Sequence, residues 1–304
     1  MYAADISKTW RCCLALAVAI CSVESFADGH EPRVKYDVEY ARVGDTPLLL
    51  DLYVPAHTPS SPVLVWVHGG AWRSGSKKDP PLLPLASRGI AIASVDYRLS
   101  PVAKFPAQAH DLKAAIRFLR GKSRDLGLNG ERIAIAGGSA GGHLAALVGV
   151  TSGVKELEGN VGEHPTQSSA VQAIVSFYGP TNLTTILQQS TPHGLSVRVP
   201  SLDLLLGGQP DVQTELARLA SPTLHVDPRD PPLLIFHGDQ DPQVPINQSH
   251  ELVGAYKKHG LSPTFEVVHG GVHGGKLFFT PEQLDQVAGF LDSNLRPASP
   301  PETK

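Results

Sequence analysis

Cysteine is scarce in this chain and is confined to its first residues. The 304 residues include 3 cysteines, which are Cys12, Cys13 and Cys21. All three fall in a segment that the pattern described below marks for removal. The processed chain would then hold no thiol, which excludes disulfides, cysteine metal sites and thiol catalysis together.

Basic charge is also in short supply. The formal net charge is −3, and no cluster of lysine or arginine is longer than two residues, as at Lys77 with Lys78. Proteins that bind nucleic acid usually carry a basic stripe or patch. Nucleic acid is therefore not an expected partner.

The apolar run near the N-terminus is short. It covers residues 12–20, well below the roughly 20 residues that a membrane-spanning helix needs. Lys8 and Arg11 precede it, and Ser25 and Ala27 place small residues at positions −3 and −1 of a cut after Ala27. We expect residues 1–27 to be a secretory signal and the protein to be periplasmic or extracellular, without stable membrane insertion; an uncleaved anchor is the alternative.

The rest of the chain alternates between two patterns. Residues 34–43 and 48–55 predict an antiparallel pair of strands. Continuous apolar runs, which are typical of parallel strands buried on both faces, then alternate with helical spacing. We expect an α/β fold in one domain, residues 28–296, with a mostly parallel eight-stranded sheet and helices on both faces. The runs are 63–67, 90–95, 132–137, 173–179, 233–238 and 264–270, and the helices are 107–120, 140–150, 247–259 and 281–294.

Two segments interrupt the alternation. Residues 152–169 are polar, and residues 181–230 hold five prolines, of which Pro192, Pro200, Pro210 and Pro222 are expected to separate short helical pieces. Insertions of this kind lie over a sheet and often carry specificity, so we expect a small cap at 181–230. The tail, residues 297–304, is predicted to be disordered.

A serine stands between glycines where a predicted strand meets a predicted helix. Gly137, Ser139 and Gly141 match G-x-S-x-G, the turn that holds a nucleophilic serine in a strained conformation with Oγ exposed. Such glycines let two backbone segments cross at close range. The alternative is a phosphate-binding loop, but G-x-x-x-x-G-K-[ST] is absent from the sequence and the G-x-G-x-x-G spacing is not met at this turn.

Two further loops offer the partners that a serine nucleophile needs. A base must take the hydroxyl proton, and an acid must orient that base, in the chain order Ser, Asp, His. The loop after residues 233–238 supplies Asp239 and Asp241, and the loop after 264–268 supplies His269 and His273. Both loops leave the carboxyl ends of strands, where sites form in open α/β sheets. The residues alone leave both choices open.

A third loop could stabilise a negatively charged oxygen. His68, Gly69, Gly70 and Ala71 follow the run at 63–67 directly, as in the loops whose backbone N–H groups form an oxyanion hole together with the residue after the nucleophile, here Ala140. The simpler interpretation of the glycines is a tight turn. Beside Ser139, the catalytic interpretation is favoured.

These motifs together resemble the α/β-hydrolase superfamily, and within it the hormone-sensitive-lipase-like bacterial esterases, closest to the secreted feruloyl-esterase-like branch. The similarity runs from about residue 34 to 295 and includes HGGAWRSGSK, GGSAGGHLAAL, HGDQDPQVP and GGVHGGKLF. The resemblance implies a triad of Ser139, Asp241 and His273, because the acid of that branch is followed by x-x-V-P and its base stands before glycine, away from the strand end. It also implies oxyanion donors at Gly69, Gly70 and Ala140, and a substrate pocket that Trp72 lines unless it packs under the loop.

The function expected from these observations is a cofactor-independent, metal-independent serine carboxylesterase. The resemblance favours short-chain, aryl or carbohydrate-linked carboxylic esters, and the oligomeric state stays open. An arylformamidase-like amide hydrolase is the alternative reaction. A non-catalytic binding protein on a hydrolase scaffold is the alternative of another class, and it predicts that a triad member is missing.

Overall fold

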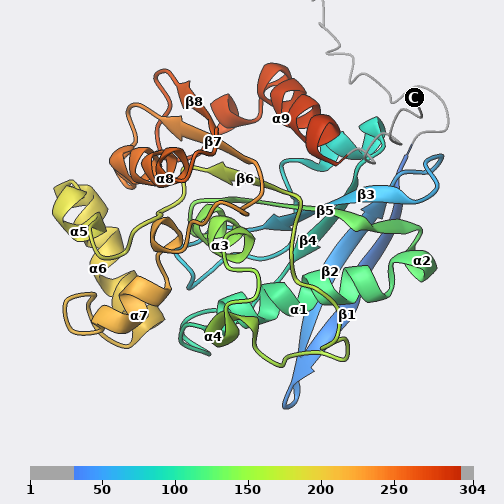
Figure 1. Cartoon of the computed structure of the whole chain (residues 1–304), viewed down its shortest axis with the longest axis horizontal. Helices are drawn as coiled ribbons and strands as arrows, with labels where there is room; N and C mark the ends of the chain where they lie inside the picture. The colour runs from blue at the N-terminus through green and yellow to red at the C-terminus, as the bar shows by residue number, and fades with distance from the viewer. Residues whose placement is uncertain (1–30, 296–304) are drawn as a thin grey trace, which may run out of the picture.

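The computed structural model describes residues 31–295, so the predicted signal segment and tail lie outside the described residues. Eight strands form one sheet in the order β1-β2-β4-β3-β5-β6-β7-β8 (Figure 1). β2 is antiparallel to β1, as the sequence predicts, and it is also antiparallel to β4. All other neighbours are parallel, which confirms the mostly parallel sheet. The strands are β1 Arg33–Val43, β2 Thr46–Val54, β3 Ser61–Val67, β4 Ala91–Val95, β5 Leu128–Gly138, β6 Ala173–Phe177, β7 Leu233–Gly238 and β8 Thr264–Val268.

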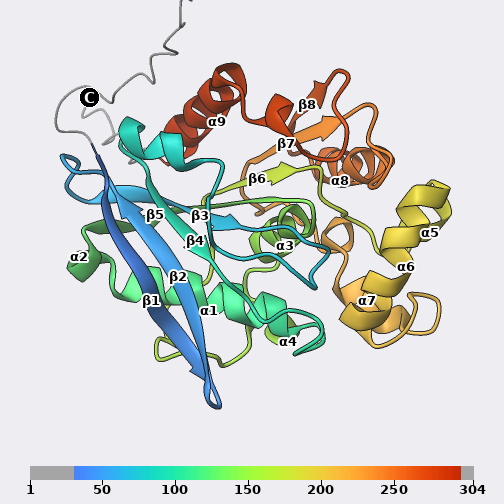
Figure 2. The same ribbon diagram turned by 180° about the vertical axis from the view of Figure 1, so that it is seen from behind.

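Helices cover both faces of the sheet (Figures 1 and 2). Alternate residues of β5 enter opposite cores: Ile135 packs in the core that contains residues of α1 and α3, and Ala136 in the core that contains residues of α9. This two-sided burial explains the continuous apolar runs. The helices are α1 Ala107–Gly121, α2 Ser123–Leu126, α3 Ala140–Gly149, α4 Lys155–Glu158, α5 Ile186–Gln189, α6 Pro192–Leu206, α7 Thr214–Leu219, α8 Asn247–Lys258 and α9 Pro281–Asn294, with short 3-10 helices at Leu83–Arg88, Pro222–Leu224 and Lys276–Phe278.

The segment 181–230 holds α5, α6 and α7, which lie together at one side of the molecule in both views (Figures 1 and 2). The expectation that its prolines separate short helices is wrong at Pro200, which lies inside the 15-residue helix α6. Proline in a helix interior costs roughly 3 kcal/mol. The apolar side chains that follow it, Leu202, Leu205 and Leu206, are buried in the core. Burial of each contributes about 1.5–3 kcal/mol, so the three together exceed that cost.

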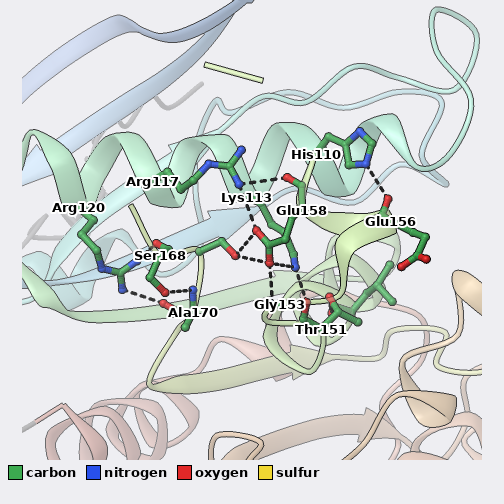
Figure 3. A network of polar contacts seen from close by, with 12 residues as sticks. His110, Lys113, Arg117, Arg120, Thr151, Gly153, Glu156, Glu158, Ser168 and Ala170 are labelled. Atoms are coloured by element: carbon green, nitrogen blue, oxygen red, sulfur yellow. Dashed lines mark hydrogen bonds and ion pairs between the residues drawn. The ribbon is translucent and has the colours of Figure 1, made fainter. Parts of the chain in front are cut away.

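The polar segment 152–169 is fastened to α1 by ionic contacts (Figure 3). Glu158, at the end of α4, accepts a hydrogen bond from the fully buried Lys113 at 2.8 Å and pairs with Arg117 at 3.2 Å. Ser169 donates to both oxygens of the same carboxylate. This network could not be predicted from the sequence, because Lys113 and Glu158 lie 45 residues apart and no local pattern indicates that they pair.

Candidate active site

Ser139 occupies the sharp turn between β5 and α3. Its φ of +55° is uncommon for a residue that carries a Cβ, and its amide donates to the carbonyl of Phe177 at 2.9 Å. A Cβ placed on Gly141 would lie 2.0 Å from the carbonyl oxygen of Val67. Glycine is therefore required where the helix crosses β3, and the turn lifts the serine above the carboxyl end of the sheet.

The structure brings Ser139, His273 and Asp241 into one hydrogen-bonded chain. His273 Nε2 lies 2.8 Å from Ser139 Oγ, and His273 Nδ1 lies 2.7 Å from Asp241 Oδ2. A carboxylate only accepts, so Nδ1 carries the imidazole proton and Nε2 accepts from the serine hydroxyl. This is the tautomer that a general base for Ser139 needs.

Asp241 is held by several donors at once. Its side chain is buried, and Oδ1 accepts from the amides of Gln243 at 2.8 Å and Val244 at 2.9 Å. Burial alone would raise the pKa of Asp241. The hydrogen bonds from His237 and His273, the charge of His273 and the amide of Val244 together lower it by more, so the pKa lies well below its usual range. The carboxylate is therefore ionised at neutral pH.

His237 is a neighbour of this carboxylate that sequence analysis missed. Its ring is fully buried, with Nε2 2.9 Å from the carbonyl oxygen of Val244 and 3.4 Å from Asp241 Oδ2. Nδ1 lies 2.7 Å from Ser249 Oγ, which fits a hydroxyl donating to a neutral ring. Its position at the end of β7, four residues before Asp241, was the available signal.

The alternative pair predicted from the sequence also forms, but apart from the serine. His269 Nδ1 lies 2.9 Å from Asp239 Oδ2, and the side chain of His269 is 86% exposed. The amide of Gly270 donates to the other oxygen of Asp239. Of the two candidate Asp–His pairs, only the pair of Asp241 and His273 is hydrogen-bonded to Ser139 in the described part of the chain, through His273.

The loop after β3 lies against the nucleophile. A Cβ on Gly69 would lie 2.8 Å from the carbonyl oxygen of Gly138 and 3.3 Å from Ser139 Cβ. Gly70 has a φ of +104°, and its carbonyl accepts from the amides of Arg73 and Ser74, each at 3.1 Å. Gly69 and Gly70 line the same cleft as Ser139, and Ala140 begins α3 beside them.

Trp72 packs under the loop, which is one of the two positions expected for it. It does not line the cleft, because its side chain is fully buried beneath the loop. Its indole N–H donates to His143 Nδ1 at 3.0 Å. His143, to which the sequence assigns no role, is a buried hydrogen-bonding partner of the loop.

The cleft around Ser139 has a volume of about 410 Å³. Aromatic side chains of Trp66, Tyr178 and Phe279 form part of its lining, together with polar residues that include Arg73 and Gln243. A larger hollow of about 590 Å³ beside β1 contains none of the predicted site residues. The cleft at Ser139 is therefore the candidate site, and its aromatic lining suits a partly apolar ligand.

Tyr178 is a second residue that sequence analysis missed. Its ring meets that of His273 edge to face, with centroids 5.1 Å apart. Burial, and then the charge of Asp241, raise the pKa of Tyr178 to about 12, so the phenol remains protonated at neutral pH. Tyr178 directly follows β6 at the carboxyl edge of the sheet, which was the available signal.

Residues 31–295 contain no group of three or more His, Cys, Asp or Glu side chains that could hold a metal ion. In the same range, none of the helices is both long and apolar enough to cross a membrane.

The mostly parallel sheet with helices on both faces, and the serine on a strained turn after β5, define an α/β-hydrolase. The BD-FAE family model matches residues 50–256, more than half of the chain, and the chain belongs to this family. The resemblance stated from the sequence is thereby confirmed.

Proteins of known name are similar over most of the chain. Esterase LipC of Mycobacterium tuberculosis is 34% identical over 234 residues, which are 74% of this chain and 54% of LipC. A truncated carbohydrate esterase from gut microbiota superposes with a TM-score of 0.80 at 31% identity, over 88% of this chain and 98% of that one. A bifunctional GH43-CE protein of Bacteroides eggerthii gives a TM-score of 0.79 at 35% identity, over 86% of this chain and 35% of that one. The chain spans about half the length of the curated relatives it matches.

Proposed function

We propose that this protein is a serine carboxylesterase. The observation that carries the proposal is the continuous chain from Ser139 Oγ through His273 to Asp241, with distances of 2.8 Å and 2.7 Å, in which Ser139 and His273 line the cleft. Membership of the BD-FAE family and similarity to named esterases support the same reaction class.

Acylation begins when Ser139 Oγ attacks the ester carbonyl carbon while His273 Nε2 takes the hydroxyl proton. The carbonyl π bond opens to a tetrahedral oxyanion, and Asp241 stabilises the imidazolium that forms. Collapse of the intermediate breaks the bond to the alcohol, which leaves with the proton from Nε2. Water then attacks the acyl-serine by the same route, and the carboxylic acid and free Ser139 result.

Backbone amides at Gly69, Gly70 and Ala140 would receive the oxyanion. In support of this role, Gly69 and Gly70 line the same cleft as Ser139, and Ala140 is the residue after the nucleophile. Removal of one such donor costs on the order of 10²- to 10³-fold in rate in enzymes that use an oxyanion hole.

We assign short-chain acyl esters of carbohydrates, or aryl esters, as the substrate class. The similarity to a carbohydrate esterase from gut microbiota supports a sugar as the alcohol part of the ester. Aromatic side chains such as Trp66 and Phe279 in the cleft are surfaces on which a sugar or aryl ring can pack.

The proposal is tested with residues 28–304 on p-nitrophenyl acetate, butyrate and decanoate in the presence of chelator. The wild-type protein is expected to hydrolyse the two short esters, and Ser139→Ala is expected not to. Hydrolysis of N-formyl aryl amides in preference to these esters would assign an arylformamidase. No hydrolysis of either class would support the binding-protein alternative.

We also propose that the protein is exported after cleavage behind Ala27, on the signal-like pattern of residues 1–27. Mass spectrometry of the N-terminus after expression of the full chain in a bacterium tests this. The expected product starts at Asp28 and is recovered from the periplasm or medium, and a full-length product in the cytoplasm would contradict export.

A further inference from the structure

The loop that carries Gly69 and Gly70 contains two consecutive residues in an unfavourable backbone conformation. Ala71 and Trp72 have φ values of +52° and +59°, a region that residues with a Cβ rarely adopt. Such strain persists only where the surrounding structure holds the backbone in place. The contacts of Trp72 show what holds this loop.

The indole of Trp72 is fixed by a hydrogen bond from inside the molecule. Its Nε1–H donates to His143 Nδ1 at 3.0 Å, and the two rings meet edge to face at 85°. An indole can only donate, so Nδ1 is unprotonated and Nε2 carries the proton. Nε2 donates to the carbonyl oxygen of Ala220 at 2.7 Å. One neutral tautomer of His143 therefore makes both contacts.

The surroundings keep that tautomer in place. Trp72 and His143 are both fully buried. Burial lowers the pKa of His143 to about 4, against the hydrogen bond to Ala220 and with a further contribution from the charge of Arg198. A protonated ring would direct a second N–H at the indole N–H, which the buried geometry disfavours.

The cap supplies the outer contacts of the same bridge. Ala220 follows α7 directly, and Arg198 of α6 places its guanidinium carbon 5.7 Å from the centroid of the Trp72 ring. Arg198 is fully buried and donates to the carbonyl of Gln243, a residue of the cleft lining. The indole is thus held between α3 and the cap.

His143 also belongs to the first turns of the helix that follows the nucleophile. Its amide donates to the carbonyl of Ser139 at 2.9 Å. The helix that follows Ser139 therefore holds Trp72, the residue after Gly69, Gly70 and Ala71, through His143. A single side chain links the nucleophile to the loop that faces it.

We propose that His143 is a positioning residue, which sets the oxyanion donors against Ser139 by accepting the Trp72 indole N–H and anchors this bridge to the cap at Ala220. The inference rests on the proposed function, because it concerns the oxyanion hole of the same site. It assigns catalytic importance to two side chains that do not line the cleft.

The test compares His143→Leu, Trp72→Phe and the double variant in residues 28–304. Each single variant is expected to lower kcat on p-nitrophenyl acetate by about 10- to 100-fold, because small misplacements of catalytic groups have effects of this size. KM should change by less than about threefold, since the hydrogen bond acts on the transition state. The kcat of the double variant should be no lower than that of the more severe single variant, because both substitutions remove the same hydrogen bond between Trp72 and His143.

A transition-state analogue separates positioning from loss of fold. A short alkyl trifluoromethyl ketone forms a tetrahedral adduct with a serine nucleophile, and its oxyanion needs the same donors. Its inhibition constant should rise by the factor by which kcat falls. His143→Asn, whose Oδ1 can occupy the place of Nδ1, should recover part of kcat relative to His143→Leu.

His225→Leu is the matched control. His225 lies in the cap and contacts the carbonyl of Leu219 through Nε2 at 2.9 Å, and it does not line the cleft. It should retain wild-type kcat and inhibitor binding even if its melting temperature falls. Wild-type kcat in His143→Leu and Trp72→Phe, or additive losses in the double variant, would overturn the inference.

The outcomes also distinguish this inference from the proposed function. Wild-type protein no more active than Ser139→Ala refutes the function and the inference with it. Active wild type together with fully active bridge variants refutes the inference alone. If His143→Leu does not fold, Trp72→Phe decides, because it removes the donor and keeps an aromatic ring in the same space.

Discussion

Substitution of Asp241 by asparagine probes the orientation of His273 directly. The amides of Gln243 and Val244 point at Oδ1, at 2.8 Å and 2.9 Å, so the asparagine carbonyl oxygen must take that place. The asparagine NH₂ group then occupies the Oδ2 position, 2.7 Å from His273 Nδ1. Because NH₂ only donates, Nδ1 must accept, and the proton moves to Nε2, where Ser139 needs an acceptor.

The expected loss in kcat is about 10⁴-fold, the size of the effect of this change in serine proteases that use the same triad. It corresponds to roughly 5.4 kcal/mol of transition-state stabilisation. The assay is steady-state hydrolysis of p-nitrophenyl acetate at pH 7.5, with the melting temperature measured in parallel.

Asp239→Asn is the matched control, because Asp239 makes the equivalent contact with the exposed His269 at 2.9 Å. It should retain kcat within about twofold, since this pair does not contact Ser139. A loss below tenfold in Asp241→Asn, or an equal loss in both variants, would refute the assignment of Asp241 and His273.

Two further predictions concern stability. Glu158→Gln leaves Lys113 and Arg117, both buried, without a countercharge, and should lower the free energy of unfolding by about 3 kcal/mol in urea titrations with kcat unchanged; an unaltered unfolding midpoint would contradict the buried network. For Asp230, burial, and then the charge of Asp227, raise the pKa to about 7 despite the Asp227 amide and Arg229. The raised pKa means that the protonated carboxyl stabilises the fold below the unfolded pKa of about 4, and that this contribution is lost as pH rises through 7. The melting temperature of Asp230→Asn should therefore equal that of wild type at pH 4 and exceed it by a growing margin as the pH rises to 8. A difference in melting temperature that stays constant across that range would contradict the raised pKa.

The fold could be predicted because its signals are local. Parallel strands such as β3 and β5 are buried on both faces and form continuous apolar runs, and Ser139 stands where one of these runs meets a helix. The loops at the carboxyl ends of β7 and β8 then confine the acid and base to two candidates each.

What could not be predicted depends on contacts between distant residues. The residues alone leave Asp239 with His269 and Asp241 with His273 as equal choices; the family resemblance selects the second pair, and the loop geometry brings that pair to Ser139. Trp72 and His143 are 71 residues apart, and although each lies in a motif, no local pattern indicates that they contact each other. Pro200 was misread because a local rule on helix breaking was overridden by burial of the apolar side chains of α6.

The most direct test of the central claim is whether Ser139 itself becomes covalently modified. Residues 28–304 are treated with a fluorophosphonate ester, which reacts with activated serine hydroxyls, and the digested protein is mapped by mass spectrometry. One phosphonate adduct is expected on the peptide that contains Ser139, with much slower labelling in Asp241→Asn and none in Ser139→Ala. Labelling of a different serine, or an unmodified Ser139 in protein that hydrolyses esters, would contradict the claim.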